Sequence, residues 1–402
     1  MKAIGPIPPG FGVANDGSLA VAGHSAEALA LRAGASPLFV YDSALIAEKI
    51  ARFRTAFPSV ALHYAVKANP YAPLLEWFTS RVDGFDLASA GELARVAALG
   101  LPVSLAGPGK RDSELEAAIY AGVTINLESE SEAARALAIA DRLGVTPKLA
   151  IRVNPPFALK GAGMKMGGQG TQFGLDADRV PALVRTLLAA NADWCGLHVY
   201  AGSQALNADS LITLQRETLA LVAEIAARAG AVPPNVNLGG GFGIPYFAGD
   251  SSLGIESVGE MLEKLLKTQP KAISFSIEIG RWLVGEAGVY LTRVIDRKVS
   301  GGKTFLVTDG GLHHMLAASG NFGQLLRRNY PIASATRFGD PAAEEVTVTG
   351  CLCTPLDLLG DEVLLPRTEV GDLIAIFCAG AYGLSASPQG FLSQPEAREI
   401  FV

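Results

Sequence analysis

The sequence has few cysteines and no long apolar run. Its 402 residues include only Cys195, Cys351, Cys353 and Cys378, and their spacing matches neither a disulfide framework nor a zinc ribbon. No uncharged apolar run reaches the roughly 18 residues that a membrane helix needs. The first residues lack the apolar core of a signal peptide. We therefore expect a cytoplasmic protein with reduced thiols and no membrane partner.

Basic residues do not outnumber acidic ones, which argues against partners that carry a high negative charge. A formal net charge of -6 argues against nucleic acid or an anionic membrane as the main partner. Hydrophobic residues make up 49% and charged residues 18%, which is typical of a folded chain with a large core. The length favours two or three domains, although a (β/α)-barrel alone can take about 250 residues.

Between about residue 45 and residue 285, short β-branched runs alternate with longer Ala- and Leu-rich runs. The predicted strands are Val60–Val66, Val82–Leu87, Val103–Ala106, Val123–Leu127, Leu149–Val153, Cys195–Tyr200, Val236–Leu238 and Ile273–Ile277. The predicted helices include Leu74–Ser80, Gly91–Leu99, Ser113–Ala121, Ser131–Leu143, Val180–Ala190, Leu211–Ala229 and Val258–Leu266. Strands that alternate with helices imply a parallel sheet, and eight such units close a (β/α)8 barrel. A doubly wound sheet usually has fewer strands, so we prefer the barrel.

The pattern changes after residue 285. Strand-like runs recur at Val289–Val299, Thr304–Thr308, Glu345–Val348 and Asp372–Phe377 with Gly/Pro turns between them, and no strong helix follows. Residues 36–42 form a further predicted strand, which could join this β domain. We therefore predict an N-terminal segment at 1–44 that joins the β domain, a barrel at 45–285 and an all-β domain at 286–402. The Gly- and Met-rich residues 160–174 are long enough to form a mobile cover over a site.

Residues that directly follow barrel strands are candidates for chemistry, because barrel active sites lie at the carboxyl ends of the strands. Lys67 follows the first predicted strand, where desolvation makes an amine a useful nucleophile toward aldehydes. A surface lysine at the start of a loop is the plainer interpretation of this residue alone. Gly239-Gly240-Gly241 follows the seventh strand, and its amides could approach a phosphate closely. A simple turn is the alternative there.

The eighth strand leads into Glu278-Ile279-Gly280-Arg281. A carboxylate beside a pyridine nitrogen keeps that nitrogen protonated, so that the ring accepts electrons from a breaking bond. Arg281 could hold a phosphate or another anion. The alternative is an ion pair between Glu278 and Arg281 at the barrel rim.

Taken together, these motifs resemble the fold-type III PLP-dependent decarboxylases, the family of diaminopimelate, ornithine and arginine decarboxylases. The resemblance extends over nearly the whole chain and rests on Tyr64–Asn69, Phe85–Leu93, Gly202–Gln204, Gly239–Gly241, Glu278–Arg281, Cys353 and Gly380–Gly383. Within the family the sequence looks closest to the exosortase-associated pyridoxal-dependent decarboxylases, with a likeness to the glutamyl-carrier-protein decarboxylase of butirosin synthesis. The resemblance implies an α/β fold with a (β/α)8 TIM-like barrel plus a C-terminal all-β domain, and pyridoxal 5'-phosphate as cofactor.

The resemblance also implies roles for individual residues. Lys67 would hold the cofactor as a Schiff base, and Glu278 would face the pyridine nitrogen. The cofactor phosphate would be held by Ser203, Gly241, Arg281 and Tyr382, with further cofactor contacts from Asp86, Arg152, Tyr200, Gly240 and Gly280. Glu92 matches an acid found near the Schiff-base lysine. Cys353 would return a proton to the carbanion from the partner subunit's β domain, which implies a homodimer with shared active sites; an inert buried thiol is the alternative.

The sequence departs from the family in two places that bear on the cofactor and the substrate. Relatives usually carry a histidine where Tyr200 stands; a tyrosine can stack on a ring but does not titrate near neutral pH. His198 lies two residues earlier and is a candidate substrate contact. Ornithine and diaminopimelate enzymes commonly have an acid where Thr354 stands, and that acid would pair a distal ammonium. Asp309 remains another candidate partner for a substrate amine.

The segment after Asp309 also differs from that of the diaminopimelate enzymes. His313 and His314 suggest a metal, but no third ligand is spaced for one, so we interpret them as substrate-side or interface residues. Arg327 and Arg328 would meet an acidic substrate or carrier, or form a solvated face. These differences favour a glutamyl or other aminoacyl substrate, free or on a carrier protein.

Three other functions stay open. The chain could be a diaminopimelate decarboxylase proper. It could be a racemase of similar architecture, although that family prefers an arginine at the pyridine nitrogen where Glu278 stands here. It could also be a non-catalytic regulatory protein derived from a decarboxylase, although such proteins tend to lose the lysine or the cofactor contacts.

Overall fold

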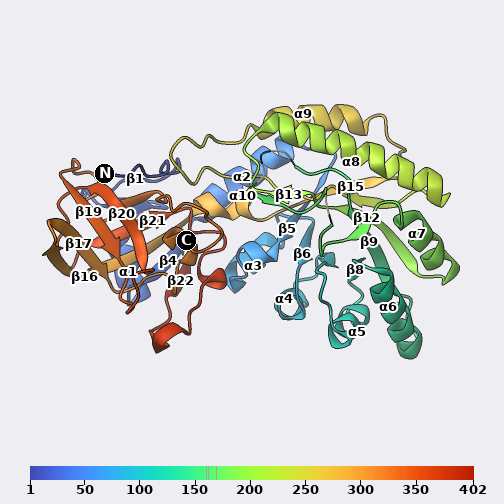
Figure 1. The fold of residues 1–402 in the computed structure, drawn as a ribbon, viewed down its shortest axis with the longest axis horizontal. Helices are drawn as coiled ribbons and strands as arrows, with labels where there is room; N and C mark the ends of the chain where they lie inside the picture. The colour runs from blue at the N-terminus through green and yellow to red at the C-terminus, as the bar shows by residue number, and fades with distance from the viewer. Residues whose placement is uncertain (160, 162, 169) are drawn as a thin grey trace. The chain divides into compact units, whose positions relative to one another are not determined.

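The computed structural model describes residues 1–159, 161, 163–168 and 170–402, and the chain divides into two compact units (Figure 1). The barrel unit comprises residues 50–243 and 252–280, and the β unit comprises residues 1–49, 244–251 and 281–402. The main divisions fall after Lys49 and Gly280, whereas the sequence predicts divisions after residues 44 and 285. The strand and helix patterns do not reveal that residues 244–251 belong to the β unit.

The barrel unit contains a closed ring of eight parallel strands, as predicted. Each strand pairs with the next around the ring, and the last returns to the first. In ring order the strands are β5 (Ala61–Ala65), β6 (Gly84–Leu87), β7 (Val103–Leu105), β8 (Thr124–Leu127), β9 (Lys148–Asn154), β12 (Asp193–Val199), β14 (Asn235–Asn237) and β15 (Ser274–Ile279). All eight strands predicted for the barrel are confirmed, with ends shifted by a few residues.

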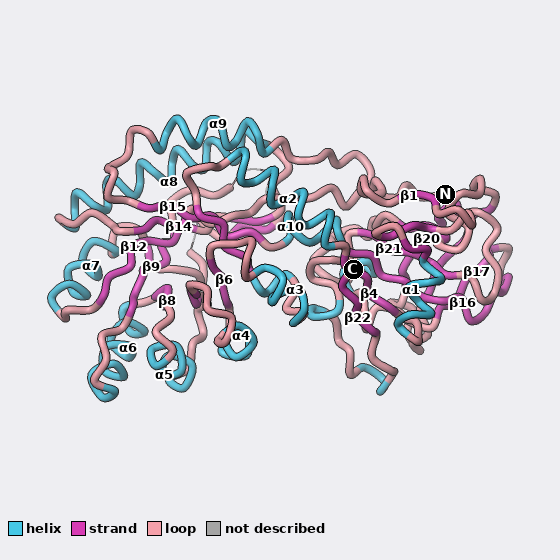
Figure 2. Tube along the Cα trace, turned by 180° about the vertical axis from the view of Figure 1, so that it is seen from behind, coloured by secondary structure: helices cyan, strands magenta, loops and turns pink. Residues whose placement is uncertain are grey.

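Helices precede the first barrel strand or connect successive barrel strands, and they lie on the outside of the ring (Figure 2). They are α2 (Ser43–Ala56), α3 (Ala72–Phe78), α4 (Ala90–Val96), α5 (Asp112–Tyr120), α6 (Glu130–Leu143), α7 (Val180–Ala189), α8 (Ala208–Ala229) and α9 (Ile255–Leu266). Of these, α8 packs against both α7 and α9. The predicted helices are confirmed, whereas α2 was not predicted. None of the helices in the described part of the chain is long and apolar enough to cross a bilayer.

Local sequence explains where these helices begin and end, as α6 illustrates. The Ser129 side chain accepts a hydrogen bond from the backbone N–H of Glu132, which satisfies one of the free donors in the first turn. The helix ends before Gly144, whose φ of 66° lies in the left-handed region that glycine adopts without steric cost. These caps place the residues before the helix, including Glu128, at the carboxyl end of β8.

The β unit is built on a mixed sheet. Its strands follow the order β18 (Ile332–Ser334), β21 (Leu373–Phe377), β16 (Gly288–Ser300), β17 (Lys303–Thr308), β19 (Glu344–Thr349) and β20 (Leu358–Leu365), with β4 (Leu38–Tyr41) paired to β16 and β22 (Arg398–Phe401) paired to β4. The predicted strands correspond to β16, β17, β19 and β21, and β4 joins the sheet as expected for residues 36–42. Strands β18, β20 and β22 were not predicted.

Smaller elements complete the β unit. They are a three-stranded sheet of β1 (Gly12–Val13), β2 (Leu19–Val21) and β3 (His24–Ser25), the helices α1 (Ala26–Ala33) and α10 (Arg281–Val284), and the 3-10 turns η2 (Gly285–Ala287), η3 (Leu316–Ser319), η4 (Leu384–Ala386) and η5 (Phe391–Ser393). The unit is therefore not purely β, because α1 from the N-terminal segment lies in its core.

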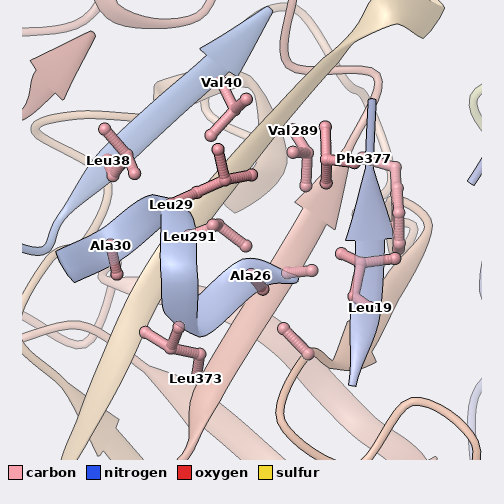
Figure 3. Packing of buried hydrophobic residues seen from close by; sticks show 13 residues of the cluster. Leu19, Ala26, Leu29, Ala30, Leu38, Val40, Val289, Leu291, Leu373 and Phe377 are labelled. Carbon is pink, nitrogen blue, oxygen red and sulfur yellow. The ribbon is translucent and has the colours of Figure 1, made fainter. Parts of the chain in front are cut away.

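The core of the β unit explains why the N-terminal segment belongs to it. In the sheet, Val40 lies opposite Val289 and Leu38 lies opposite Leu291, and Leu29 of α1 packs over these side chains (Figure 3). Each such side chain contributes about 1.5–3 kcal/mol when it is removed from water. The N-terminal strand and helix thus complete a core that the C-terminal strands alone would leave uncovered.

Candidate active site

Lys67 stands at the carboxyl end of the first barrel strand. It lies in η1 (Val66–Ala68), directly after β5, and is half-buried. Its Nζ is 5.4 Å from the centre of the Tyr200 ring. Burial raises the pKa of Glu92, and the nearby charge of Lys67 offsets part of that rise. The Glu92 Oε2 accepts a hydrogen bond of 2.6 Å from the Ala88 backbone N–H. The amine therefore lies near an aromatic ring and an acid at the barrel mouth.

Glu278 is a buried acid at the carboxyl end of β15. Its Oε2 accepts a hydrogen bond from Asn237 Nδ2 at 3.0 Å, and His198 Nε2 lies 3.2 Å from the same oxygen. Burial alone would raise the pKa of Glu278, but His198, Lys67 and Arg152 outweigh burial and hold that pKa below its ordinary value. The structure thus keeps an ionised carboxylate in the barrel interior, as a pyridinium partner requires.

Asp86, on β6, is the second buried acid of this group. Ser104 Oγ donates a hydrogen bond of 2.7 Å to its Oδ1. Burial, followed by the nearby charge of Glu278, raises the pKa of Asp86 well above its ordinary value. Two neighbouring carboxyl groups cannot both ionise at low cost. Burial and the charge of Glu278 thus favour the protonated form of Asp86.

Tyr200 and Arg152 lie beside Lys67. The guanidinium carbon of Arg152 is 6.0 Å from the Tyr200 ring centre and 4.8 Å from that of Phe173. Glu128 Oε1 accepts hydrogen bonds from Arg152 Nη1 at 3.0 Å and from the Gly107 backbone N–H at 2.7 Å. These contacts fix Arg152 among two rings and a carboxylate.

Glu128 was not among the predicted site residues. It follows the last residue of β8, so the rule that selected Lys67 and Glu278 would also have selected it. Its Oε2 accepts a hydrogen bond of 2.8 Å from the Gly174 backbone N–H, so one carboxylate joins the segments that follow β7, β8 and β9. The residue therefore orders three loops at the barrel mouth.

The glycine-rich loop after β14 leaves no room for side chains. A Cβ on Gly240 would lie 1.9 Å from the Glu278 backbone oxygen, and one on Gly241 would lie 2.4 Å from the Gly202 oxygen. Gly241 also has a φ of 82°, which favours glycine. A Cβ on Gly280 would lie 2.5 Å from Ala68 Cβ, next to Lys67. These close approaches explain why glycine occupies all three positions.

Ser203 belongs to a short strand beside this loop. It lies buried in β13 (Gly202–Ser203), which pairs antiparallel with β10 (Met164–Lys165). The Gly163 N–H donates to the Ser203 backbone oxygen at 2.9 Å. The described residues of segment 160–174, which exclude residues 160, 162 and 169, are thus joined to Ser203 through backbone hydrogen bonds. The next strand, β11 (Leu175–Asp176), pairs with β9. Its mobility stays a prediction.

In the β unit, Arg281 is surrounded by tyrosines. Arg281 Nη1 donates a hydrogen bond of 2.9 Å to the Tyr246 hydroxyl, and its guanidinium carbon lies 4.5 Å from the Tyr382 ring centre. Tyr382 has a φ of 53°, a conformation that non-glycine residues rarely adopt and that often occurs at functional sites. Tyr246 was missed because a tyrosine in a loop gives no signal of its own in the sequence.

Cys353 lies exposed in the loop between β19 and β20, so the alternative of a buried thiol is wrong. The loop is tied by Asp357, whose carboxylate accepts hydrogen bonds from the Leu352 N–H at 2.8 Å and the Leu312 N–H at 2.6 Å. Thr354 is half-buried in the same turn, and its hydroxyl accepts from the Leu356 N–H at 3.3 Å. The turn presents the thiol while its backbone is fixed.

Asp309 forms hydrogen bonds within the β unit. Its Oδ1 accepts from Thr292 Oγ1 at 2.7 Å and from the Arg293 N–H at 2.8 Å, and its Oδ2 accepts from Ser36 Oγ at 2.6 Å. Both oxygens therefore have partners, which favours a structural role over the predicted contact with a substrate amine.

The two histidines that follow form a buried pair, with ring centres 3.8 Å apart. His314 Nε2 lies 2.8 Å from the Pro395 oxygen, and burial together with His314 lowers the pKa of His313 to about 4. No group of three His, Cys, Asp or Glu side chains that could hold a metal ion occurs among the residues that the structure describes.

The two arginines at 327 and 328 differ in their surroundings. Arg327 donates to the backbone oxygens of Ser319 and Leu358, which gives it a structural role. Arg328 is exposed, and its guanidinium lies 3.7 Å from the Phe247 ring centre. Of the pair, only Arg328 presents its charge at the surface.

These residues fit pyridoxal phosphate. The barrel unit offers an amine, an ionised acid for a ring nitrogen, an aromatic ring and a backbone cradle without side chains. The β unit offers a guanidinium that a phosphate would neutralise. The predicted cofactor residues of each unit therefore lie close to one another within that unit.

Comparisons with known proteins agree with this chemistry. Residues 43–285 match the family model described as "Pyridoxal-dependent decarboxylase, pyridoxal binding domain". The chain is 37% identical to the L-glutamyl-[BtrI acyl-carrier protein] decarboxylase of Niallia circulans, over 91% of this chain and 88% of that protein. It is 32% identical to a diaminopimelate decarboxylase of Neisseria meningitidis, again over 91% and 88%.

A solved structure shows the same architecture. The diaminopimelate decarboxylase of M. jannaschii in complex with L-lysine superposes with a TM-score of 0.87 at 26% identity, covering 98% of this chain and 93% of that one. The agreement extends over both units and confirms the barrel with an added β domain.

Proposed function

Because this chain belongs to the family of pyridoxal-dependent decarboxylases, we propose that it decarboxylates an aminoacyl group, such as a glutamyl group, carried by an acyl-carrier protein. The protein is a PLP-dependent decarboxylase of an amino acid or aminoacyl substrate. The identity of the substrate and the roles of individual residues are the proposal. The residue roles rest on the placement of Lys67 directly after β5 and of Glu278 near the end of β15, where the charge of Lys67 helps to lower the pKa of Glu278.

When bound, PLP supplies an aldehyde that captures the substrate amine and a ring that accepts the electron pair left by carbon dioxide. Lys67 would provide the amine that attaches the cofactor. Glu278, which accepts a hydrogen bond from Asn237 and lies beside His198, would accept the ring N–H and favour a cationic ring. In the barrel unit, the loop Gly239–Gly241 would offer backbone N–H groups to a phosphate and Tyr200 would offer an aromatic face to a ring. In the β unit, Arg281 would offer a guanidinium to a phosphate.

Cys353 is the proposed donor of the proton that replaces the carboxylate. Its thiol is exposed on a backbone fixed by Asp357, which suits a group that must reach a substrate. We propose that it acts in the active site of the partner subunit, so that two copies of the chain form a homodimer with shared sites. The low cysteine content agrees with a reducing cytoplasm, and kinship with the exosortase-associated group stays a prediction.

Two features support a substrate without a distal ammonium. Thr354 stands where an acid would pair such an ammonium, and Asp309 has hydrogen-bond partners on both of its oxygens. A buried ammonium without a carboxylate partner is costly. A glutamyl group on a carrier has no such charge, and a relative at 37% identity is named for that reaction.

The test is release of carbon dioxide from a panel of substrates. Free diaminopimelate, ornithine, arginine, lysine and glutamate are compared with a glutamyl group that is attached through its γ-carboxyl to a phosphopantetheinylated carrier protein, so that its α-carboxylate stays free. We expect turnover of the glutamyl carrier and rates at least about 100-fold lower for the free diamino acids. Rapid turnover of a free diamino acid would reject the proposed substrate while leaving the reaction class intact.

Diaminopimelate is the second candidate substrate. The 32% identity to a diaminopimelate decarboxylase over most of both chains favours it. The same panel separates the two, because diaminopimelate carries the distal ammonium that the first proposal excludes. The named relatives are decarboxylases, which leaves no observation in favour of a racemase or a non-catalytic protein.

A further inference from the structure

Arg281 is a largely buried cation without an acidic partner. Among the residues that the structure describes, no carboxylate forms an ion pair with it. Its contacts are the Tyr246 hydroxyl at 2.9 Å and the rings of Tyr382 and Tyr246, whose centres lie 4.5 Å and 5.5 Å from the guanidinium carbon. A guanidinium removed from water needs an anion or several hydrogen bonds to offset its lost hydration. The surroundings of Arg281 therefore suit an added anion.

Tyr246 is the residue that fixes the direction of this guanidinium. Its hydroxyl accepts a hydrogen bond from Nη1, which leaves the other guanidinium N–H groups to a ligand. Burial raises the pKa of Tyr246 to about 12, so that the phenol stays neutral and would not compete with a bound anion for the charge. Its effect is orientation.

The position of Tyr246 is itself determined by the fold of the β unit. The Asp250 carboxylate accepts hydrogen bonds from the backbone N–H groups of Tyr246 and Phe247, at 3.1 Å and 3.0 Å. The Tyr246 ring packs against the Tyr330 ring at 4.9 Å. A Cβ on Gly5 would lie 2.0 Å from the Tyr246 backbone oxygen, which shows how closely the N-terminal segment approaches.

We propose that Tyr246 is a positioning residue that fixes the Arg281 guanidinium for the phosphate group of the cofactor. The inference rests on the proposed function, because it takes the anion to be the phosphate of PLP. It extends that function to a residue outside the family's recognisable motifs in this sequence. Preorganised donors bind an anion more tightly than donors that must first be ordered.

The test compares Tyr246→Phe with Tyr330→Phe as a matched control. Both remove one hydroxyl from packed rings, but only the Tyr246 hydroxyl bonds Arg281 in the described structure. Equilibrium affinities for PLP and for pyridoxal, which lacks the phosphate, are measured by absorbance for the cofactor-free protein. We expect Tyr246→Phe to weaken PLP binding about tenfold while pyridoxal binding is unchanged. Inorganic phosphate should compete with PLP correspondingly less well.

A double-mutant cycle separates positioning from a structural effect. In an Arg281→Lys background, Tyr246→Phe should cause no further loss of PLP affinity, because the oriented guanidinium is already absent. Melting temperatures of all variants, measured without cofactor, show whether each is folded. Equal losses for PLP and pyridoxal, full additivity in the cycle, or an unchanged PLP affinity in Tyr246→Phe would overturn the inference. Failure of the wild-type protein to bind PLP would instead reject the proposed function.

Discussion

The two units present their functional side chains in opposite ways. In the barrel unit, Glu278 and Asp86 are buried, and each accepts a hydrogen bond from a residue of an adjacent strand. The pKa of Asp86 is raised, whereas that of Glu278 is lowered. In the β unit, Arg281 has no carboxylate partner among the described residues, and Cys353 is exposed. The two acids of the barrel unit thus have hydrogen-bond partners within that unit. The guanidinium of Arg281 and the thiol of Cys353 would instead find their partners in a ligand or a second subunit. Under the proposed function, the barrel unit would supply the amine and the acid for the ring nitrogen, and the β unit would supply a phosphate ligand and a proton donor.

Loss of the barrel amine should have the largest effect. In Lys67→Ala the cofactor has no covalent attachment, and we expect decarboxylation to fall roughly 10³-fold or more, as when other covalent groups are removed. The measurement is carbon dioxide release at saturating substrate, together with loss of the visible absorption of the PLP-loaded protein. Lys110→Ala is not a suitable control, because Lys110 is buried against Glu132; the exposed Lys267→Ala is. Retained absorption in Lys67→Ala would contradict the assignment.

Removal of the ionised acid should come next. Glu278→Gln keeps the size of the side chain but loses the charge that holds a pyridine nitrogen protonated, and we expect a loss of activity of roughly 10² to 10³-fold. A shift in the absorption of the PLP-loaded protein should accompany it. If Glu278→Gln retained both full activity and the original spectrum, the role of Glu278 as the partner of the ring nitrogen would be wrong.

The exposed thiol tests whether the β unit acts on a partner. Cys353→Ala should lower activity by roughly 10²-fold, the usual range for a lost general acid, whereas Cys351→Ala serves as the neighbouring control. When Lys67→Ala and Cys353→Ala subunits are co-expressed in equal amounts, shared sites should restore roughly a quarter of the wild-type activity, since half of the dimers contain one intact site. No recovery in a verified mixed dimer would show that each chain uses its own cysteine.

Tyr200 should give a smaller effect. Tyr200→His introduces a ring whose ordinary pKa is about 6.5, so the charge beside Lys67 and Arg152 becomes dependent on pH. We expect kcat/KM to change by no more than about fivefold and to gain a pH dependence between about pH 6 and pH 7.5 that the wild type lacks. Profiles of the two proteins that run parallel would show that Tyr200 does not influence the reacting ring.

The last prediction concerns Asp86 and the stability of the protein rather than its activity. Because the folded-state pKa of Asp86 is raised, its contribution to stability is present below the unfolded pKa and is lost as pH rises through the folded pKa. Asp86→Asn mimics the protonated acid. As pH rises, the free energy of unfolding of the cofactor-free variant should therefore increase relative to that of wild type by about 1.4 kcal/mol per pH unit, for as long as native Asp86 stays protonated. Denaturant unfolding at about pH 5.5 and pH 7.5 measures this difference. A gap that does not widen with pH would mean that Asp86 is ionised in the folded protein.

The sequence predicted the barrel well because each buried parallel strand is a short apolar run with a helix after it. Strand β20 was missed because its residues Gly360, Asp361 and Glu362 interrupt the apolar pattern, and β22 because it lies beside β4, a neighbour far away in sequence. Lys67 and Glu278 were found from their places after strands. Glu128 also follows a strand and meets the same rule, but it was not selected. The role of Tyr246 depends on a contact between distant segments that neither composition nor spacing reveals.

The most direct test of the central claim is chemical identification of the residue that attaches the cofactor. The PLP-loaded protein is reduced with borohydride and digested, and the modified peptide is sequenced by mass spectrometry. The account predicts a single pyridoxyl adduct, on Lys67. An adduct on another lysine, or none in protein that has bound PLP, would contradict it.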